Sequence, residues 1–249
     1  MLARCSACRS EPEHKIDFTM AFQPIVDVER KAVWGYEALV RGPGGKSAES
    51  VLDAVNDTNR YWFDQACRVK AIELAAKLFR PTARLSINFM PNAVYEPRAC
   101  IRATLEASRK FSFEPKRLMF EFTENEEVSD PSHLEKIVTA YKSMGFLTAI
   151  DDFGAGHSGL GLLANFQPDV TKIDMKLVRG IERSPARRAI IRSVKALADE
   201  LGMTVLAEGV ETAEEYECLK SFGIRLFQGD YFARPVTAAV PVVRDLQSV

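Results

Sequence analysis

Residues 168–208 read PDVTKIDMKLVRGIERSPARRAIIRSVKALADELGMTVLAE, in which two short apolar runs flank one helical pattern. The run PDVTK ends at Lys172, and the run TVLAE ends at Glu208. Between them, Ser184 stands before a proline, as N-cap residues do, and Gly202 ends the pattern, as helix-terminating glycines do. A strand, a helix and a second strand in this order predict two parallel strands of one sheet.

The same alternation recurs along the whole chain. Seven short apolar runs each end in a residue that carries a side-chain oxygen or amine. The runs and their last residues are AVWGYE at Glu37, RLSIN at Asn88, RLMFE at Glu121, FLTAID at Asp151, PDVTK at Lys172, TVLAE at Glu208 and IRLFQ at Gln228. Apolar runs without polar alternation are typical of strands that are covered on both faces.

This alternation over 249 residues predicts an α/β fold, a TIM-type (β/α)8 barrel that fills one domain. A doubly wound open sheet is the alternative. The barrel is favoured because polar groups end nearly every strand, whereas an open sheet collects them at one switch point. We expect residues 1–16 to form a short N-terminal extension and residues 17–249 to form the domain.

Composition excludes several classes of protein. The formal net charge is -1 and long basic runs are lacking, which argues against a nucleic-acid polymer as partner. No apolar run approaches the ~18 residues of a membrane span, and the N-terminus lacks a signal-peptide core, so we expect a cytoplasmic protein. The five cysteines, an odd number, indicate reduced thiols. Cys5, Cys8 and His14 could supply three zinc ligands, but no second CxxC supplies a fourth, so a loose extension is favoured.

The strand ends would gather at the mouth of a barrel. They carry five carboxylates, two amides and one ammonium group: Glu37, Glu121, Asp151, Asp152, Glu208, Asn88, Gln228 and Lys172. Carboxylates at close quarters repel one another unless cations neutralise them. An all-oxygen ligand set indicates hard ions such as Mg²⁺ or Mn²⁺, and the number of acids favours two ions, which suits hydrolysis of a phosphoryl ester.

Lys172 stands inside an apolar run, where an unpaired ammonium would be costly, so we expect it to face acids or substrate. There it could orient water, neutralise charge on a phosphorane or act as a base. A lysine that extends to solvent from the strand end is the structural alternative. From chemistry alone, a carbon-acid lyase of the enolase type is the competing function, since it also uses a barrel, a lysine and carboxylate-bound Mg²⁺.

The stretch YEALVRG, residues 36–42, resembles the signature of the EAL family of bacterial cyclic di-GMP phosphodiesterases. The resemblance continues in order over about residues 18–236, through FQPIVD, INFMP, FEFTE, DDFGAGHSGL, KIDMKLV, AEGVET and FQGDYFARP. It implies a modified barrel with one antiparallel strand and the hydrolysis of cyclic di-GMP to linear pGpG.

The resemblance also implies roles for individual residues. The metal ligands would be Glu37, Asn88, Glu121, Asp151, Asp152, Glu208 and Gln228, with Lys172, Glu208 and Glu37 in catalysis. Substrate would contact Gln23, Leu39, Arg41 and Asp174, while Glu124 and Glu211 would support the ligands and the loop after Asp152. His157, Gly159 and Asp230 depart from the family pattern, and none of them is a ligand.

Three functions follow from the resemblance: an active phosphodiesterase, a receptor that binds cyclic di-GMP without cutting it, and a protein-binding adaptor. The complete ligand set favours the enzyme, because the loss of one inner acid would cripple a two-metal site. By analogy with the family we also expect a homodimer, and a regulatory protein partner is an open alternative.

Overall fold

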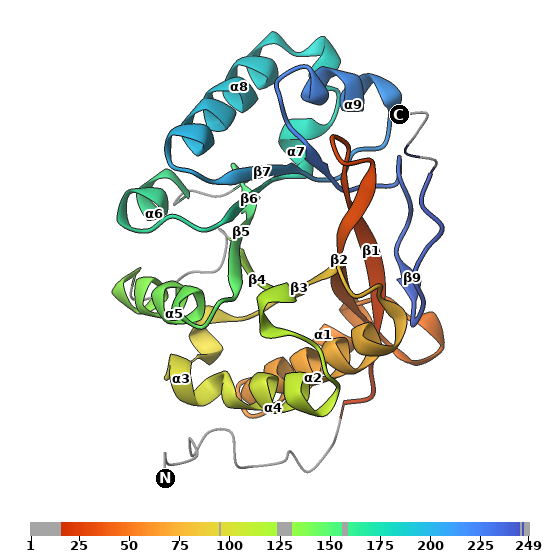
Figure 1. Ribbon diagram of the computed structural model, residues 1–249, viewed down its shortest axis with the longest axis vertical. Coiled ribbons are helices and arrows are strands. Elements are labelled where there is room, and N and C mark those ends of the chain that lie inside the picture. The colour runs from red at the N-terminus through yellow and green to blue at the C-terminus, as the bar shows by residue number, and fades with distance from the viewer. Residues whose placement is uncertain (1–15, 95, 124–130, 156–158, 245, 247–249) are drawn as a thin grey trace.

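The computed structural model describes residues 16–94, 96–123, 131–155, 159–244 and 246. Its centre is a closed barrel whose strands follow one another in chain order, with helices packed around the outside (Figure 1). The strands are β1 (Thr19–Asp27), β2 (Ala32–Arg41), β3 (Arg84–Asn88), β4 (Leu118–Thr123), β5 (Leu147–Phe153), β6 (Val170–Ile173), β7 (Thr204–Ala207), β8 (Leu226–Phe227) and β9 (Val236–Thr237).

Strands β2 to β8 are parallel, and β1 closes the barrel by pairing antiparallel with both β2 and β8. The short strand β9 pairs antiparallel with Ala21 and Phe22, near the start of β1. The expected α/β barrel with one antiparallel strand is therefore confirmed. The seven apolar runs lie on β2 to β8, whereas β1 is not among them, because Gln23 and Pro24 interrupt its apolar residues.

The helices are α1 (Glu49–Leu52), α2 (Arg60–Leu78), α3 (Pro97–Cys100), α4 (Arg102–Lys110), α5 (Pro131–Ser143), α6 (Gly159–Asn165), α7 (Met175–Val178), α8 (Pro185–Glu200) and α9 (Ala213–Lys220). The N-cap expected at Ser184 is present, and α9 begins with a second one. The Ser184 hydroxyl accepts a hydrogen bond from Arg187 N, and Thr212 and Glu215 form a capping box. Within the described ranges, no helix combines the length and the apolar character that a membrane span needs.

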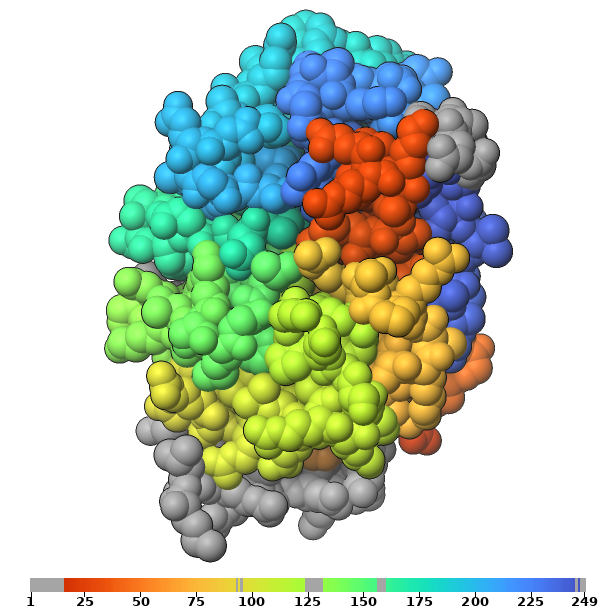
Figure 2. Space-filling model, in the orientation of Figure 1, coloured from red at the N-terminus to blue at the C-terminus, as the bar shows by residue number. Residues whose placement is uncertain are grey.

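Two apolar clusters build the core. The larger one lies between the strands and the surrounding helices. The smaller one contains Ile25, Met119, Ala149, Val170, Leu206 and Leu226, which come from β1 and from β4 to β8. Figure 2 shows a continuous surface across one face of the molecule. One end of the barrel is thus packed with side chains, as in other barrels of this type.

Gly229 lies where the loop after β8 meets the loop after β7. Its φ is 153°, and a Cβ atom on this residue would lie 2.1 Å from Val210 O and 2.4 Å from Val210 N. We expect Gly229→Ala to lower the free energy of unfolding by about 3 kcal/mol, because the backbone contact must open. Urea titration of the variant and the parent protein measures this loss.

Gly145→Ala is the matched control for this prediction. Gly145 has a φ of 85°, but a Cβ atom there would meet nothing within 4 Å. Only the conformational cost applies, so we expect a loss of about 1 kcal/mol. Equal losses in the two variants would contradict the role assigned to the contact with Val210.

Candidate metal centre

The candidate site forms one layer above the apolar filling of the barrel. Glu121, Asp151, Lys172, Glu208 and Gln228 each stand two residues after a member of the smaller apolar cluster. Side chains two residues apart in a strand point to the same face, so the polar groups also point inward. Because β1 runs in the opposite direction, its contribution is Gln23, two residues before Ile25.

Lys172 on β6 lies at the centre of this layer, and its side chain is 0% exposed. The Nζ atom lies 2.7 Å from Glu208 Oε1, 2.8 Å from Glu121 Oε2 and 3.1 Å from Asp151 Oδ1. A fourth carboxylate oxygen, Glu37 Oε2, lies 3.6 Å away. The expectation that Lys172 faces acids is confirmed in the geometry, and the alternative in which it reaches solvent is wrong.

Glu37 on β2 is held by two amide groups. Asn88 Nδ2 donates to Glu37 Oε1 at 2.8 Å, and Gln228 Nε2 donates to Glu37 Oε2 at 2.6 Å. Gln228 Nε2 also lies 3.1 Å from Gln23 Oε1, so the antiparallel strand reaches the same network. Gln228 Oε1 is buried and accepts no hydrogen bond, which leaves a free oxygen beside the acids.

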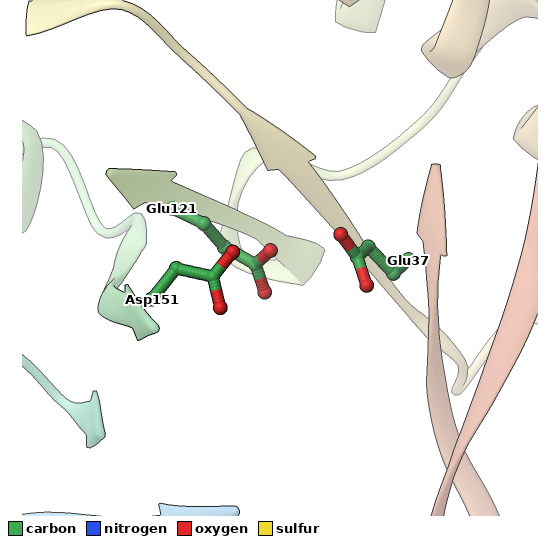
Figure 3. Close-up of side chains that lie close together, drawn as sticks. All are labelled: Glu37, Glu121 and Asp151. Carbon is green, nitrogen blue, oxygen red and sulfur yellow. The ribbon is translucent and has the colours of Figure 1, made fainter. Parts of the chain in front are cut away.

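The carboxylates form two groups that share one residue. Oxygens of Glu37, Glu121 and Asp151 lie within 4.8 Å of one another, and so do oxygens of Asp151, Asp152 and Glu208. Figure 3 shows the first group, whose carboxylates come from separate strands and point toward one another. Two carboxylate groups that share Asp151, together with the unpaired amide oxygen, fit two hard divalent cations.

Asp151 and Asp152 are neighbours in β5 and still reach the same group. Strand alternation by itself would send them to opposite faces. The pairing of β5 with β6 shifts between Ile150 and Phe153, and Asp152 adopts a φ of 55°. This bulge turns the Asp152 carboxylate toward Asp151, whose Oδ1 accepts a hydrogen bond from Asp152 N at 3.0 Å.

Burial and neighbouring charges shift the pKa values of the acids in the cluster. Burial raises the pKa of Glu121 to about 8, although Lys172 opposes the shift. Burial, with help from Asp151 and Asp174, raises the pKa of Asp152 to about 6. For Asp151, burial would raise the pKa, but Lys172 and hydrogen bonds outweigh it and the net shift is downward. Added cations would displace the protons that the crowded acids hold.

The residues expected to contact substrate lie around the cluster. Leu39, Arg41 and Asn88 line a cavity of about 410 Å³ beside the acids. The Arg41 guanidinium donates to Val40 O at 2.7 Å. Asp174 caps α7 by accepting from Lys176 N at 2.6 Å, and it also hydrogen-bonds with Asp152.

Other expected residues lie farther from the acids or outside the described ranges. Glu211 forms an ion pair with Arg179 at 2.6 Å, and Asp230 forms one with Arg234 at 2.9 Å. Gly159 begins α6. Cys5, Cys8, His14, Glu124 and His157 lie outside the residues that the structure describes.

Two residues of the site were not identified from the sequence. Ser86 on β3 donates a short hydrogen bond to Glu121 Oε1 and is buried, and its position two residues before Asn88 could have revealed it. Glu215 forms the capping box with Thr212 at the start of α9. Its carboxylate also accepts from Gly180 N at 2.9 Å and from Glu211 N at 3.0 Å, which ties the loop after β7 to the end of α7.

Comparison with known proteins gives one family. The model of the EAL domain matches residues 7–235. The match begins inside the stretch expected as an extension, so the boundary at residue 17 stays a prediction. A standalone EAL protein from Vibrio cholerae O395, solved with c-di-GMP bound, has a TM-score of 0.90 and 53% identity. The alignment covers 93% of this chain and 98% of that one.

Other relatives differ in length and in name. BlrP1 from Klebsiella pneumoniae, solved with manganese and cyclic di-GMP, has a TM-score of 0.85 and 38% identity over 94% of this chain and 61% of that one. The blue light- and temperature-regulated antirepressor BluF of Escherichia coli K12 is 32% identical over 90% of this chain and 55% of BluF. Further relatives bear the name cyclic di-GMP phosphodiesterase. This chain spans 23% to 55% of the length of these curated relatives.

Proposed function

We propose that this chain, which belongs to the EAL domain family, hydrolyses one phosphodiester bond of cyclic di-GMP and releases linear pGpG. The observation that carries the proposal is the pair of carboxylate groups that share Asp151 around a fully buried Lys172. The relatives named cyclic di-GMP phosphodiesterases and the ligand-bound structures support the choice of substrate.

Two Mg²⁺ or Mn²⁺ ions would be held by Glu37, Asn88, Glu121, Asp151, Asp152, Glu208 and Gln228. When bound, such ions lower the pKa of a coordinated water and offset negative charge on the phosphoryl oxygens. The donor set fits them, because it combines carboxylate oxygens from several strands with the buried, unpaired amide oxygen of Gln228.

Hydrolysis to pGpG joins a water oxygen to phosphorus and breaks the bond from phosphorus to the ribose 3′ oxygen, which takes up a proton. Lys172 is held in place by Glu121, Glu208 and Asp151, so its ammonium presents fixed positive charge. Fixed charge of this kind stabilises the negative charge that develops on the phosphoryl group. Glu37 and Glu208 contribute to catalysis because they hold the Lys172 ammonium in position beside the attacked phosphorus.

The cavity beside the acids suits the rest of the nucleotide. Leu39 offers an apolar wall, and Arg41 offers a planar cation that can bind a phosphate with two hydrogen bonds. Gln23 lies within reach of Gln228, and Asp174 orients Asp152. We assign substrate binding to Gln23, Leu39, Arg41 and Asp174, and Asp174 also orients Asp152.

Glu37→Ala tests the proposed function. We expect the parent protein with Mg²⁺ or Mn²⁺ to convert cyclic di-GMP to pGpG, and the variant to lose turnover, because Glu37 belongs to one carboxylate group and is held by two amides. Chromatography of the nucleotides measures both. Asp57→Ala, at a side chain that is 89% exposed, is the control and should keep full activity.

The alternatives are separated by the same assay. Intact nucleotide after prolonged incubation, with tight binding in equilibrium dialysis, would establish a receptor instead of an enzyme. Absence of binding would favour an adaptor, a role for which the antirepressor name of BluF gives a precedent among the relatives. The homodimer and a regulatory partner stay predictions, for which analytical ultracentrifugation is the measurement.

A further inference from the structure

A buried ion pair on α2 lies outside the carboxylate groups, and the proposed reaction does not use it. Asp64 Oδ2 lies 2.5 Å from Arg68 Nη2, one helical turn away, and the two side chains are 3% and 0% exposed. Burying two charges costs hydration that their attraction rarely repays, and apolar replacements are often as stable. A gain in folding stability is therefore a weak explanation for the presence of this buried ion pair.

Aromatic rings hold Arg68 in place. Its guanidinium carbon lies 5.6 Å from the ring centre of Phe89 and 5.4 Å from that of Phe120, and Nη1 donates to the Tyr141 hydroxyl at 3.2 Å. Phe89 directly follows Asn88, and Phe120 directly precedes Glu121. The cation thus lies behind the ends of two strands that carry candidate ligands.

Asp64 uses its other oxygen to hold the backbone. Asp64 Oδ1 accepts a hydrogen bond from Met90 N at 3.2 Å, just after β3 ends at Asn88. Asp64 and Met90 both line the cavity of about 410 Å³ that also contains Leu39 and Arg41. Arg68 fixes one carboxylate oxygen of Asp64, so the direction of the other is fixed as well.

We propose that Asp64 is a positioning residue for substrate binding. Anchored by Arg68, it holds the Met90 amide and thereby sets the segment from Asn88 to Met90 that forms one wall of the cavity. The expected effect of Asp64 on the binding of cyclic di-GMP rests on the proposed function. The placement of the Met90 backbone is independent of that function and can be measured separately.

A matched pair of double variants isolates the hydrogen bond. Both Asp64→Asn with Arg68→Met and Asp64→Leu with Arg68→Met remove the ion pair and leave no unpaired charge. Asparagine keeps an oxygen that can accept from Met90 N, whereas leucine, of similar size, does not. A purely structural role of the ion pair predicts the same behaviour for both variants.

We expect the leucine variant to differ from the asparagine variant in two measurements. Hydrogen exchange of the Met90 amide should be about tenfold faster, and the KM for cyclic di-GMP should be about tenfold higher, as the loss of one buried hydrogen bond implies. The kcat should stay within about threefold, because the acids around Lys172 are unchanged. The asparagine variant keeps the acceptor for Met90 N but loses the Arg68 anchor, so we expect its exchange rate and its KM to lie between those of the parent protein and those of the leucine variant.

Equal exchange rates and equal KM values in the two double variants would overturn the proposal. If the leucine variant does not fold, hydrogen exchange is measured in the parent protein alone. A Met90 amide that exchanges there at the rate of an unstructured peptide would also overturn the proposal. If the parent protein neither binds nor cleaves cyclic di-GMP, the proposed function fails, while the exchange ratio still decides the role of Asp64.

Discussion

Asp151→Asn is expected to reduce kcat by about a thousandfold or more, with Mg²⁺ or Mn²⁺ present. The physical reason is that Asp151 belongs to both carboxylate groups, so the loss of its charge weakens both candidate metal positions at once. It also removes one of the anions that hold Lys172 Nζ, at 3.1 Å. Steady-state assays of pGpG formation and calorimetric titration with Mn²⁺ measure the two effects.

Asp152→Asn is the comparison for this prediction. Asp152 belongs to one carboxylate group only, so we expect a smaller loss of Mn²⁺ binding, in which one of two sites is retained. Asp199→Asn, at a side chain that is 60% exposed on α8, controls for the substitution itself and should change neither quantity. A kcat above a tenth of the parent value in Asp151→Asn would contradict the assignment of a shared ligand.

Lys172→Met is expected to abolish hydrolysis and, in EDTA, to lower the free energy of unfolding by about 3 kcal/mol. The substitution removes the only described cation within 4.0 Å of Glu37, Glu121, Asp151 and Glu208, and leaves these acids to repel one another. Divalent cations should restore part of the lost stability, because they supply the missing positive charge. Urea titrations with and without Mn²⁺ measure both changes.

Lys142→Met is the control, because it shows how much stability the loss of a lysine outside the carboxylate groups removes. Lys142 forms an ion pair with Asp169 at 3.2 Å, but its side chain is 40% exposed, so we expect a change within about 0.5 kcal/mol. Mn²⁺ should stabilise the Lys142 variant no more than the parent protein. A Lys172→Met protein that is as stable as the parent in EDTA would show that the carboxylates do not need the ammonium.

Much of the fold could be predicted from the sequence because its signals are local. Ser184 before a proline and Gly202 after the last helical turn both act within one turn of the helix. Each apolar run from β2 to β8 is likewise a local pattern. The polar residue that closes each run indicated both a barrel mouth and the chemistry of its ligands.

Parts of the site could not be predicted because they depend on pairing between distant segments. Strand β1 lacks a continuous apolar run, so the residue pattern alone does not show that Gln23 points into the barrel, whereas the pairing of β1 with β2 and β8 does. Ser86 lies inside an ordinary strand pattern, and its bond to Glu121 forms only because β3 and β4 are neighbours. The Asp64 and Arg68 pair reads as an ordinary surface pair of a helix until burial is known.

The sequence by itself determined the order of strands and helices, the polar residue that closes each strand and, through them, the family. These properties follow from chain neighbours and from side-chain chemistry. The resemblance implied one antiparallel strand, but only the tertiary structure identified it as β1, showed that a bulge turns Asp152 toward Asp151, and placed four acids around Lys172. Closure of the barrel creates these contacts, because it brings side chains from different strands into one layer whose members are far apart along the chain.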